Sequence, residues 1–469
     1  MSVAQTIDSI FHPKSIALIG ISPVPGGWTQ MFPDALQELD YDGKVYFVSR
    51  GNDNVCDSSV YPSIKEVPGP VDYAICSVAA LFAPKLIEDC ASKGVKAVHL
   101  FTAGFRETGK EEGALLEERI SRIARETGVR IIGPNCVGIY CPESKLSFSP
   151  NFPKESGPVG CISQSGGNCI RFLRLGAVRG LRYSKAVSYG NGCDLGATEF
   201  LEYLAHDLET RVIALCIEGV RDGRRFLEVL ARAAKMKPVI IYKGGYTEAG
   251  RRASTSHTGS LSGEEKIWNA LCRQAGAIRV HSVGELVDTV LTFVFMPVPK
   301  GNMAAIVGYG GGLCVQATDQ CESSGLSVPL FPEEIRDRLE SFTPDAGNSV
   351  RNPVDIQWSM SKPDKFVDTV RIISQWEGID FFIVLLTVDI IPTKGEHELL
   401  DKMVESVIKA REACSKPMAV VLHEGTSPET LARTFLLQQT LSSYGLPVYP
   451  TIGRATQAIG RFIRYHHPT

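Results

Sequence analysis

The sequence has no long hydrophobic run and no strong excess of charge. Its longest apolar runs, such as residues 381–386, are far shorter than the roughly 20 residues that a membrane-spanning helix needs. The formal net charge is only -3 at pH 7, which gives no indication of a nucleic-acid or membrane partner. The N-terminus lacks the basic and apolar regions of a signal peptide, so we expect a cytoplasmic protein.

The cysteines and histidines lack the spacings that are typical of a metal site. The 13 cysteines are scattered and include no Cys-x-x-Cys pair, so we expect no metal site. A disulfide framework is not expected either, because the chain is 469 residues long and carries no secretion signal. Most cysteines, among them Cys76, Cys161, Cys216 and Cys314, should be small buried apolar residues.

Short apolar segments alternate with helical stretches along the whole chain. Residues 15–19, 44–48 and 212–217 are typical of buried strands. The alternation predicts an α/β fold in which parallel sheets are covered by helices on both faces. Proline-rich stretches at 147–158 and 296–301 are interpreted as linkers. The prediction is three consecutive doubly wound domains, at residues 1–148, 155–297 and 300–469.

Three strand-to-helix turns are rich in glycine. The first begins at Gly20 and is not a Gly-x-Gly-x-x-Gly fingerprint, and the next strand ends at Arg50 rather than at an acidic residue. A cation there suits a ribose that carries a phosphate, as in NADP or coenzyme A. The other turns lie at 163–167 and 308–312, and helix N-termini that follow such turns favour anions. If the two domains face each other, both helices point at one phosphoryl group; plain structural turns are the alternative.

One histidine, His257, differs from the others in its neighbours. It lies in a loop of serine, threonine and glycine at 243–263, which is typical either of a linker or of an exposed, mobile residue. No metal-ligand spacing accompanies it, so a nucleophile held by a carboxylate is favoured. Glu218, at the end of the strand 212–217, is positioned to be that carboxylate. His99 lies inside an apolar strand and is expected to be a core residue.

Taken together, these residues resemble the α subunit of ADP-forming (NDP-forming) acyl-CoA synthetases, which are relatives of succinyl-CoA synthetase. The most specific motifs are Gly-Pro-Asn-Cys at 133–136 and Ser-His-Thr-Gly-Ser at 256–260, and the likeness runs almost from end to end. The resemblance implies a Rossmann-like CoA-binding domain followed by two flavodoxin-like CoA-ligase domains. The sequence departs from the family at the end of the strand 44–48 and in the turn 308–312, where a family proline is missing.

The resemblance also implies a role for each matched residue. His257 would be the phosphorylated histidine and Glu218 the carboxylate that orients it. Two helix N-termini would hold the phosphoryl group through Ser163, Gln164, Ser165, Gly166, Gly310, Gly311 and Gly312. The CoA site would be lined by Gly20, Ser22, Arg50, Val78, Thr102 and Ala103, with Asn135 and Cys136 where the acyl group meets thiol and phosphate.

The implied reaction is acyl-CoA + phosphate + ADP ⇌ carboxylic acid + CoA + ATP. Neither a phosphate-binding P-loop nor an ATP-grasp domain is found in the sequence. ADP or ATP with Mg²⁺ is therefore expected on a separate ATP-grasp β subunit, in an α₂β₂ assembly. An NADP-dependent oxidoreductase and a non-catalytic CoA-binding regulatory protein are the alternatives.

Overall fold

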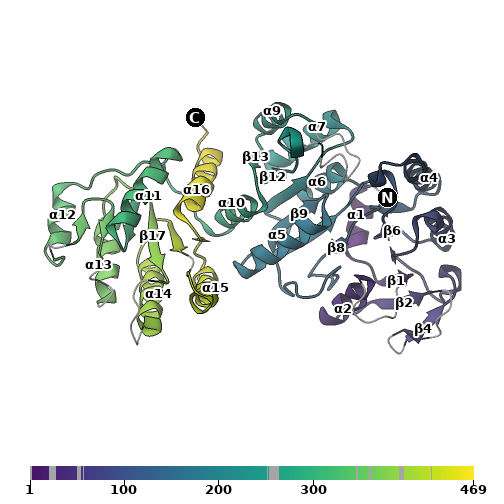
Figure 1. Ribbon diagram of the computed structural model, residues 1–469, viewed down its shortest axis with the longest axis horizontal. Helices are drawn as coiled ribbons and strands as arrows, with labels where there is room; N and C mark the ends of the chain where they lie inside the picture. Colours follow the sequence, from purple (N-terminus) through teal and green to yellow (C-terminus); the bar gives the residue numbers. More distant parts are fainter. Residues whose placement is uncertain are drawn as a thin grey trace. The chain divides into compact units, whose positions relative to one another are not determined.

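The computed structural model describes most of the chain, and Figure 1 draws it as a ribbon. Its tertiary contacts divide it into two compact units, Met1–Ala177 with Arg182–Leu286, and Val178–Leu181 with Val287–Thr469. The first unit contains two sheets and the second unit contains one. The described residues are 3–20, 28–49, 54–55, 58–250, 252, 263–344, 347–356, 359, 362–389, 396–423 and 425–468.

The first sheet has seven strands in the order β3-β4-β2-β1-β5-β6-β7. Neighbouring strands are parallel except for the short pair β3–β4. The strands are β1 (Ser15–Ile19), β2 (Lys44–Val48), β3 (Asn54–Val55), β4 (Ser58–Tyr61), β5 (Tyr73–Cys76), β6 (Ala97–Leu100) and β7 (Arg130–Ile132). The helices of this region are α1 (Val3–Phe11), α2 (Met31–Glu38), α3 (Ala83–Lys93) and α4 (Glu111–Thr127), with 3-10 turns η1 (Trp28–Gln30), η2 (Ile64–Glu66), η3 (Ala80–Phe82) and η4 (Arg106–Thr108).

The second sheet has six strands in the order β13-β12-β11-β9-β10-β8, and only β8 runs antiparallel to its neighbour. Its strands are β8 (Gly138–Tyr140), β9 (Ser156–Ser163), β10 (Tyr183–Ser188), β11 (Val212–Ile217), β12 (Val239–Lys243) and β13 (Ile278–Val280). Its helices are α5 (Gly166–Val178), α6 (Ala197–His206), α7 (Gly223–Met236) and α9 (Glu265–Ala275), and α10 (Val283–Phe295) begins in the first unit and continues in the second.

The third sheet, in the second unit, has six strands in the order β15-β16-β14-β17-β18-β19. All neighbours are parallel except β15 and β16. The strands are β14 (Ala304–Gly308), β15 (Ser349–Val350), β16 (Val354–Asp355), β17 (Phe381–Thr387), β18 (Met418–His423) and β19 (Val448–Tyr449). The helices are α11 (Gly311–Ser323), α12 (Glu333–Glu340), α13 (Pro363–Ser374), α14 (Glu396–Glu412), α15 (Pro428–Ser443) and α16 (Ile452–His466).

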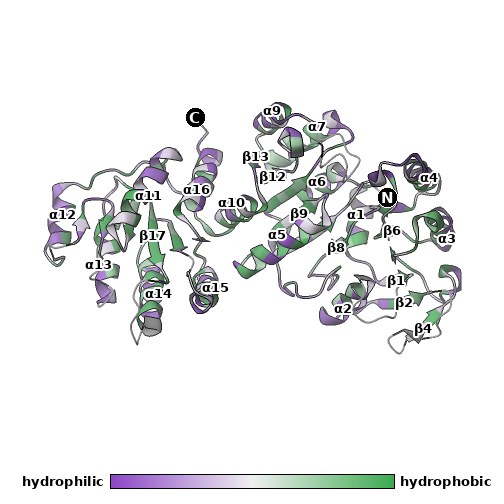
Figure 2. Ribbon diagram, in the orientation of Figure 1, coloured by the Kyte–Doolittle hydropathy of each residue, from purple (hydrophilic) through white to green (hydrophobic). Residues whose placement is uncertain are grey.

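The predicted α/β class and the parallel sheets are confirmed. Strands such as β1 and β11 are buried at every residue, because helices cover both faces of a parallel sheet. Figure 2 shows this pattern as green strands beside helices that carry both purple and green. Among the described residues, no helix combines the length and the apolar composition that crossing a bilayer requires.

The proline-rich stretch 147–158 is not the linker that its composition suggested. Phe148 and Phe152 are buried, and their rings lie 5.3 Å apart. Tyr140 of β8 contacts Phe152 at 5.2 Å and donates a hydrogen bond from its hydroxyl to the Pro153 carbonyl. Aromatic residues close in sequence to the prolines therefore anchor this stretch to the second sheet. The three domain boundaries themselves stay a prediction.

The cysteines behave as the sequence predicted wherever the structure describes them. All twelve described cysteines are free and buried, and Cys56 lies outside the described residues. A hydrogen bond between the Cys161 and Cys169 thiols, followed by burial, raises the pKa of Cys161 well above its ordinary value, and burial raises the pKa of Cys216. These groups therefore stay neutral near pH 7 and act as small apolar side chains.

His99 of β6 is the core residue that its apolar surroundings predicted. Its side chain is fully buried, and its Nε2–H donates to the Cys136 carbonyl at 3.0 Å. The rings of Phe32 and Tyr73 lie against it at 5.7 and 6.2 Å. Burial lowers its pKa to about 4, and the hydrogen bond to Cys136 opposes that shift only in part.

The burial of neutral His99 predicts a loss of stability in mild acid. In the unfolded chain the imidazole takes up a proton below its ordinary pKa of 6.5, whereas the folded protein resists protonation down to a pKa of about 4. The free energy of unfolding should therefore fall by up to about 3 kcal/mol across that window. Denaturant unfolding at several pH values measures the effect. His99→Gln should flatten this part of the profile, whereas the same change at exposed His206 should leave it unaltered.

Candidate functional site

A cavity of about 610 Å³ lies in the first unit, between strand ends of the first sheet and the N-terminus of α5. Ligands of doubly wound sheets bind at this end of the strands. The cavity brings together many of the residues that the sequence singled out, although they come from segments far apart in the chain. These are Val78, Thr102, Ala103, Asn135, Cys136, Gln164, Ser165 and Gly166.

The Gly-Pro-Asn-Cys segment at 133–136 is held against the ends of β5 and β6. The Asn135 N–H donates to the Thr102 carbonyl at 2.9 Å, and Thr102 donates from its hydroxyl to the Val78 carbonyl at 2.6 Å. Asn135 has φ of +58°, a left-handed conformation that asparagine tolerates better than most residues. The side chains that border the cavity are thus placed by backbone contacts between the first sheet and this segment.

A loop after β10 supports the same segment from the other side. The Asn191 N–H donates to the Pro134 carbonyl at 3.0 Å, and the Cys193 N–H donates to the Gly133 carbonyl at 2.9 Å. Gly190 also has a positive φ, +55°, and a Cβ atom there would lie 2.2 Å from the Pro134 oxygen. Only glycine allows the two backbones to approach this closely.

The N-terminus of α5 faces the cavity with its first backbone N–H groups. Ser165 caps the helix, because its Oγ accepts from the Asn168 N–H at 3.3 Å, and buried Ser163 donates to the Ser165 carbonyl at 2.7 Å. Gly166 and Gly167 line the cavity and belong to the first turn, whose N–H groups lack partners within a helix. Such a turn binds anions, which supports the predicted phosphate site here. Ser163 itself lies beneath the cavity as a support.

Gln164 connects this turn to Glu218. Its side chain is buried, and its Oε1 accepts from the Glu218 N–H at 2.8 Å and from the Gly219 N–H at 3.1 Å. Its own N–H donates to the Cys216 carbonyl at 2.8 Å, at the end of β11. Glu218 is partly buried, directly after β11, as the sequence predicted. The Gln164 side-chain amide therefore links the backbone at Glu218 to the turn before α5.

Replacing Gln164 with methionine should break the link between Glu218 and the turn before α5. Methionine is close in size but removes the oxygen that accepts from Glu218 and Gly219, so one partly buried and one buried N–H group lose this acceptor. We expect a loss of about 2–4 kcal/mol in unfolding free energy and a fall in activity of about 10- to 100-fold. Denaturant unfolding and steady-state rates measure both. Gln164→Glu keeps an acceptor, so a comparable loss of stability in that variant would contradict this interpretation.

The glycine turn before α11, in the second unit, differs from the turn before α5. Gly310 has φ of +96°, and its N–H donates to Asp355 Oδ1 at 3.1 Å. Asp355 is buried at the end of β16, so a carboxylate already lies at this helix N-terminus. Gly311 and Gly312 occupy the first turn of α11. The prediction that Gly310, Gly311 and Gly312 bind phosphate stays a prediction, with Gly310 engaged by Asp355.

Cys136 borders the cavity but is not a nucleophile in this setting. It is buried, and its Sγ lies 3.7 Å from the Leu100 carbonyl oxygen. Burial raises the pKa of its thiol well above the ordinary value. Because the thiolate is the reactive form, Cys136 supplies shape and a hydrogen bond at neutral pH.

Sequence reasoning missed Glu117, a buried carboxylate of α4. Its oxygens accept from Arg221 Nη2 at 2.7 Å and from Asn191 Nδ2 at 2.8 Å. Because Asn191 supports Pro134, this cluster braces the Gly-Pro-Asn-Cys segment. A second cavity of about 580 Å³ lies beside it and shares Gln164 with the first. The sequence does carry a signal for the burial of Glu117, because this residue lies on the same face of α4 as the apolar residues Ile120 and Ala124.

The remaining predicted residues divide into two groups. Gly20 directly follows β1 with φ of +73°, and a Cβ atom there would lie 2.9 Å from Cγ1 of Val78, a residue that lines the cavity. Ser22, Arg50 and His257 lie outside the described residues. Their assigned roles stay predictions.

Two family models match the chain. A CoA binding domain matches residues 14–142. A succinyl-CoA ligase like flavodoxin domain matches residues 156–293. The two matches contain, respectively, the first sheet and most of the second, and the cavity has walls from both.

Relatives that are named as ADP-forming CoA ligases are similar to this chain over nearly its full length. The acetate–CoA ligase (ADP-forming) I subunit alpha of Pyrococcus furiosus is 33% identical, with 98% of each chain covered. The acetate–CoA ligase (ADP-forming) II of Archaeoglobus fulgidus is 32% identical over 97% of this chain, which spans 66% of that protein. The solved structure of the dinucleotide forming acetyl-coenzyme A synthetase 1 of Ca. Korarchaeum cryptofilum, in complex with phosphate and ADP, superposes with a TM-score of 0.83. It is 30% identical, and the match covers 98% of this chain and 97% of that chain.

Proposed function

This chain belongs to the family of ADP-forming acyl-CoA synthetases, as an α subunit, and we propose that its cavity beside α5 is where acyl-CoA meets phosphate. Its substrates are coenzyme A or acyl-CoA, phosphate and ADP or ATP, and it is a ligase. The observation that carries the proposal is the cavity itself. It joins the Gly-Pro-Asn-Cys segment of one matched domain to the anion-binding turn of the other.

The proposed reaction has three steps. A phosphate oxygen attacks the thioester carbonyl carbon, the C–S bond breaks, and CoA leaves as the thiol while an acyl phosphate forms. A ring nitrogen of His257 then attacks phosphorus, the P–O bond to the acyl group breaks, and the carboxylate leaves. Finally the terminal phosphate oxygen of ADP accepts the phosphoryl group, which yields ATP and free His257.

The geometry around α5 supports the first step. The N–H groups of Gly166 and Gly167 and the positive helix end favour phosphate and stabilise charge that develops on it. Val78, Thr102 and Ala103 form the wall that would face the CoA thioester. Ser22 and Arg50 are proposed for the CoA phosphates on the strength of sequence alone.

Glu218 is proposed as the partner of His257. A carboxylate that accepts a hydrogen bond from one ring nitrogen leaves the other nitrogen as the nucleophile and stabilises the charged phosphohistidine. Glu218 is tied to the α5 turn through Gln164, so a histidine that contacts it would also lie near the bound phosphate. Gly311 and Gly312 of α11 are proposed as further phosphate ligands.

The nucleotide step is proposed to need a partner. The chain spans 66% of the Archaeoglobus fulgidus relative, so a longer protein of the family carries an additional segment beyond the part that matches. We assign ADP, ATP and Mg²⁺ to a separate ATP-grasp β subunit, in an α₂β₂ assembly. We also propose a cytoplasmic location, as expected from the sequence.

The domain bounds are likewise a proposal. We propose that the three domains span residues 1–148, 155–297 and 300–469.

Phosphoryl labelling of the isolated chain tests the function. With radioactive phosphate and acetyl-CoA, the α subunit alone should acquire a label that acid removes and alkali does not, with release of CoA. Propionyl-, isobutyryl- and phenylacetyl-CoA, assayed side by side, would rank the acyl groups. If no acyl-CoA gives a label while NADPH binds tightly, the chain is an oxidoreductase scaffold and the proposal is wrong.

A further inference from the structure

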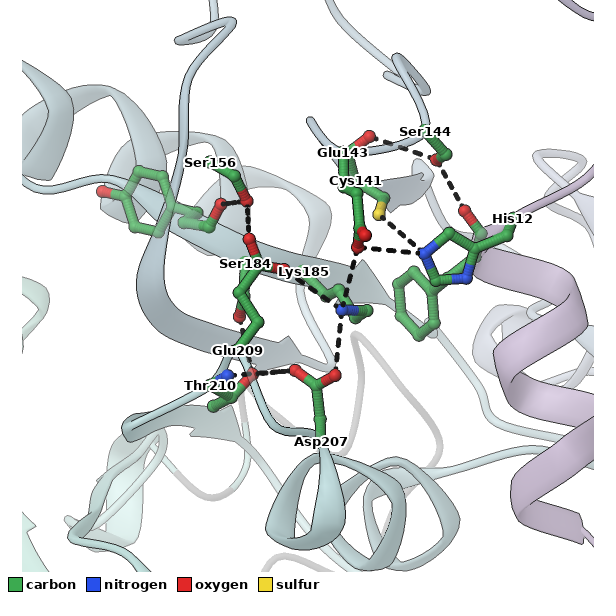
Figure 3. A network of polar contacts seen from close by, with 12 residues as sticks. His12, Cys141, Glu143, Ser144, Ser156, Ser184, Lys185, Asp207, Glu209 and Thr210 are labelled. Carbon is green, nitrogen blue, oxygen red and sulfur yellow. Dashed lines mark hydrogen bonds and ion pairs between the residues drawn. The ribbon is translucent and has the colours of Figure 1, made fainter.

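A second group of reactive side chains lies apart from the proposed catalytic cavity. His12, directly after α1, faces Cys141 and Glu143, which lie on the turn that follows β8; we refer to these three residues as the His12 cluster (Figure 3). Two of its members, His12 and Glu143, line a solvent-open hollow of about 930 Å³. All three residues belong to the first unit, and the proposed reaction uses none of them.

The His12 ring is oriented for ligation through Nε2. Its Nδ1 lies 3.0 Å from the Asp8 carbonyl oxygen, and a carbonyl can only accept, so Nδ1 carries the proton. The Nε2 atom faces the other two members, with Glu143 Oε2 at 3.2 Å and Cys141 Sγ at 4.0 Å, and without a metal its N–H donates to the Glu143 carboxylate. Histidines that bind metals usually donate their second N–H to a carbonyl or carboxylate in this way.

The turn that holds Cys141 and Glu143 is fixed before any ligand binds. Cys141 and Leu146 form a two-way backbone bridge, with N–O distances of 2.8 and 3.0 Å. Ser144 donates from its hydroxyl to the Phe11 carbonyl at 2.6 Å, which ties the turn to the end of α1. The three donor atoms are thus preorganised on two segments that lie more than a hundred residues apart in sequence.

We propose that His12 Nε2, Cys141 Sγ and a Glu143 oxygen form a Zn²⁺ site with a water molecule as the fourth ligand. All three donor atoms lie within 4.8 Å of one another. Tetrahedral zinc places N and O ligands about 3.3 Å apart and N and S ligands about 3.6 Å apart, so the cluster needs only a small contraction. A thiolate together with an imidazole favours zinc over magnesium or calcium, which prefer oxygen donors.

The charges around the cluster also favour a cation. Lys185 is buried, but its ammonium is already paired with Asp207 at 3.0 Å and Glu209 at 3.3 Å. It lies farther from Glu143, at 3.8 Å, and Asp8 adds another carboxylate beside the His12 ring. Carboxylates therefore outnumber the ammonium in this hollow, and a divalent ion offsets the excess negative charge.

The alternative is a metal-free hydrogen-bonded cluster. There the neighbours raise the pKa of His12 to about 9, with the Cys141 hydrogen bond as the first cause, so a metal competes with a proton for Nε2. The two states differ in a measurable way, because only the metal site gives a metal–sulfur bond. Zinc would also join α1 to the turn after β8 and raise the thermal unfolding midpoint.

Metal titration of the full chain tests the site. Protein treated with a chelator and dialysed should bind about one Co²⁺ per chain and show the near-ultraviolet charge-transfer band of a thiolate–cobalt bond, and Zn²⁺ should displace it. Cys141→Ser should abolish the band, and Glu143→Gln, at an exposed position, should weaken binding by about 10- to 100-fold.

The controls match the cluster in residue type. His206 lines the same hollow and donates to the Glu202 carbonyl at 2.9 Å, as His12 does to Asp8, so His206→Gln should leave binding unchanged. Cys90→Ser removes another buried thiol of the first unit and should keep the band. Wild-type protein without a charge-transfer band, or a band of equal strength in Cys141→Ser, would overturn the proposal.

Discussion

His257→Ala is expected to abolish the acid-labile phosphoryl label, with a fall of at least about 1,000-fold in both labelling and overall activity. A neutral imidazole is the side chain that best accepts a phosphoryl group near pH 7, and the loop around His257 contains no second histidine. The serine and threonine hydroxyl groups that remain around position 257 are far weaker nucleophiles at that pH. Filter-binding of radioactive protein and the rate of ATP formation with the partner measure the loss.

Phosphoryl labelling also distinguishes the loss of the phosphorylated residue from the loss of a residue that only positions it. His281→Ala removes a histidine of the same unit that contacts Tyr246 and should be labelled like the wild type. Glu218→Gln keeps the shape of the side chain but lowers its power to stabilise a charged ring, so labelling should slow by about 10- to 100-fold without loss of folding. A fully labelled His257→Ala protein would show that another residue carries the phosphoryl group.

Gly190→Ala should inactivate the enzyme through its backbone. The φ of +55° costs an alanine about 1–2 kcal/mol, and its Cβ atom would lie 2.2 Å from the Pro134 oxygen and 2.4 Å from the Asn135 oxygen. Because both contacts are with backbone, the Gly-Pro-Asn-Cys segment must shift. We expect a fall in activity of about 100-fold or more and a loss of about 3 kcal/mol in unfolding free energy.

Gly192→Ala is the matched control for Gly190→Ala. Its φ is +61°, so it carries the same backbone cost, but its Cβ atom would lie 3.0 Å from the ring of Tyr189, and the Leu195 carbonyl oxygen is at an ordinary contact distance of 3.5 Å. Both variants should lose stability, whereas only Gly190→Ala should lose most of its activity. Equal activity losses would mean that backbone strain, not displacement of residues 133–136, is responsible.

The fold was predictable because its signals are local. Buried parallel strands are short and continuously apolar, and β1, β2 and β11 begin and end at the predicted residues. The stretch at 147–158 was misread because proline-rich composition says little about contacts. Phe152 packs against Tyr140, and Phe148 packs against Phe152. β8 was missed because a three-residue strand has too little pattern to detect.

The candidate site was predictable only in part. The turn at Gly166 and the position of Glu218 follow from where strands end, and the sequence places both at strand ends. Glu117 and Asn191, which brace the Gly-Pro-Asn-Cys segment, escaped because their partners are distant in sequence. Asp355 at the N-terminus of α11 also escaped sequence analysis, because its hydrogen bond to Gly310 joins residues that lie 45 positions apart in the sequence.

The sequence alone determined the α/β class, the glycine turns and the family, because periodicity and contiguous motifs are properties of neighbouring residues. Only the tertiary structure decided which distant side chains meet. It joined Gln164 to Glu218 in the candidate site, and it brought His12 to Cys141 and Glu143, where linear spacing had predicted no metal site. Ligand geometry is set by strand order and helix packing, so spacing along the chain does not reveal it.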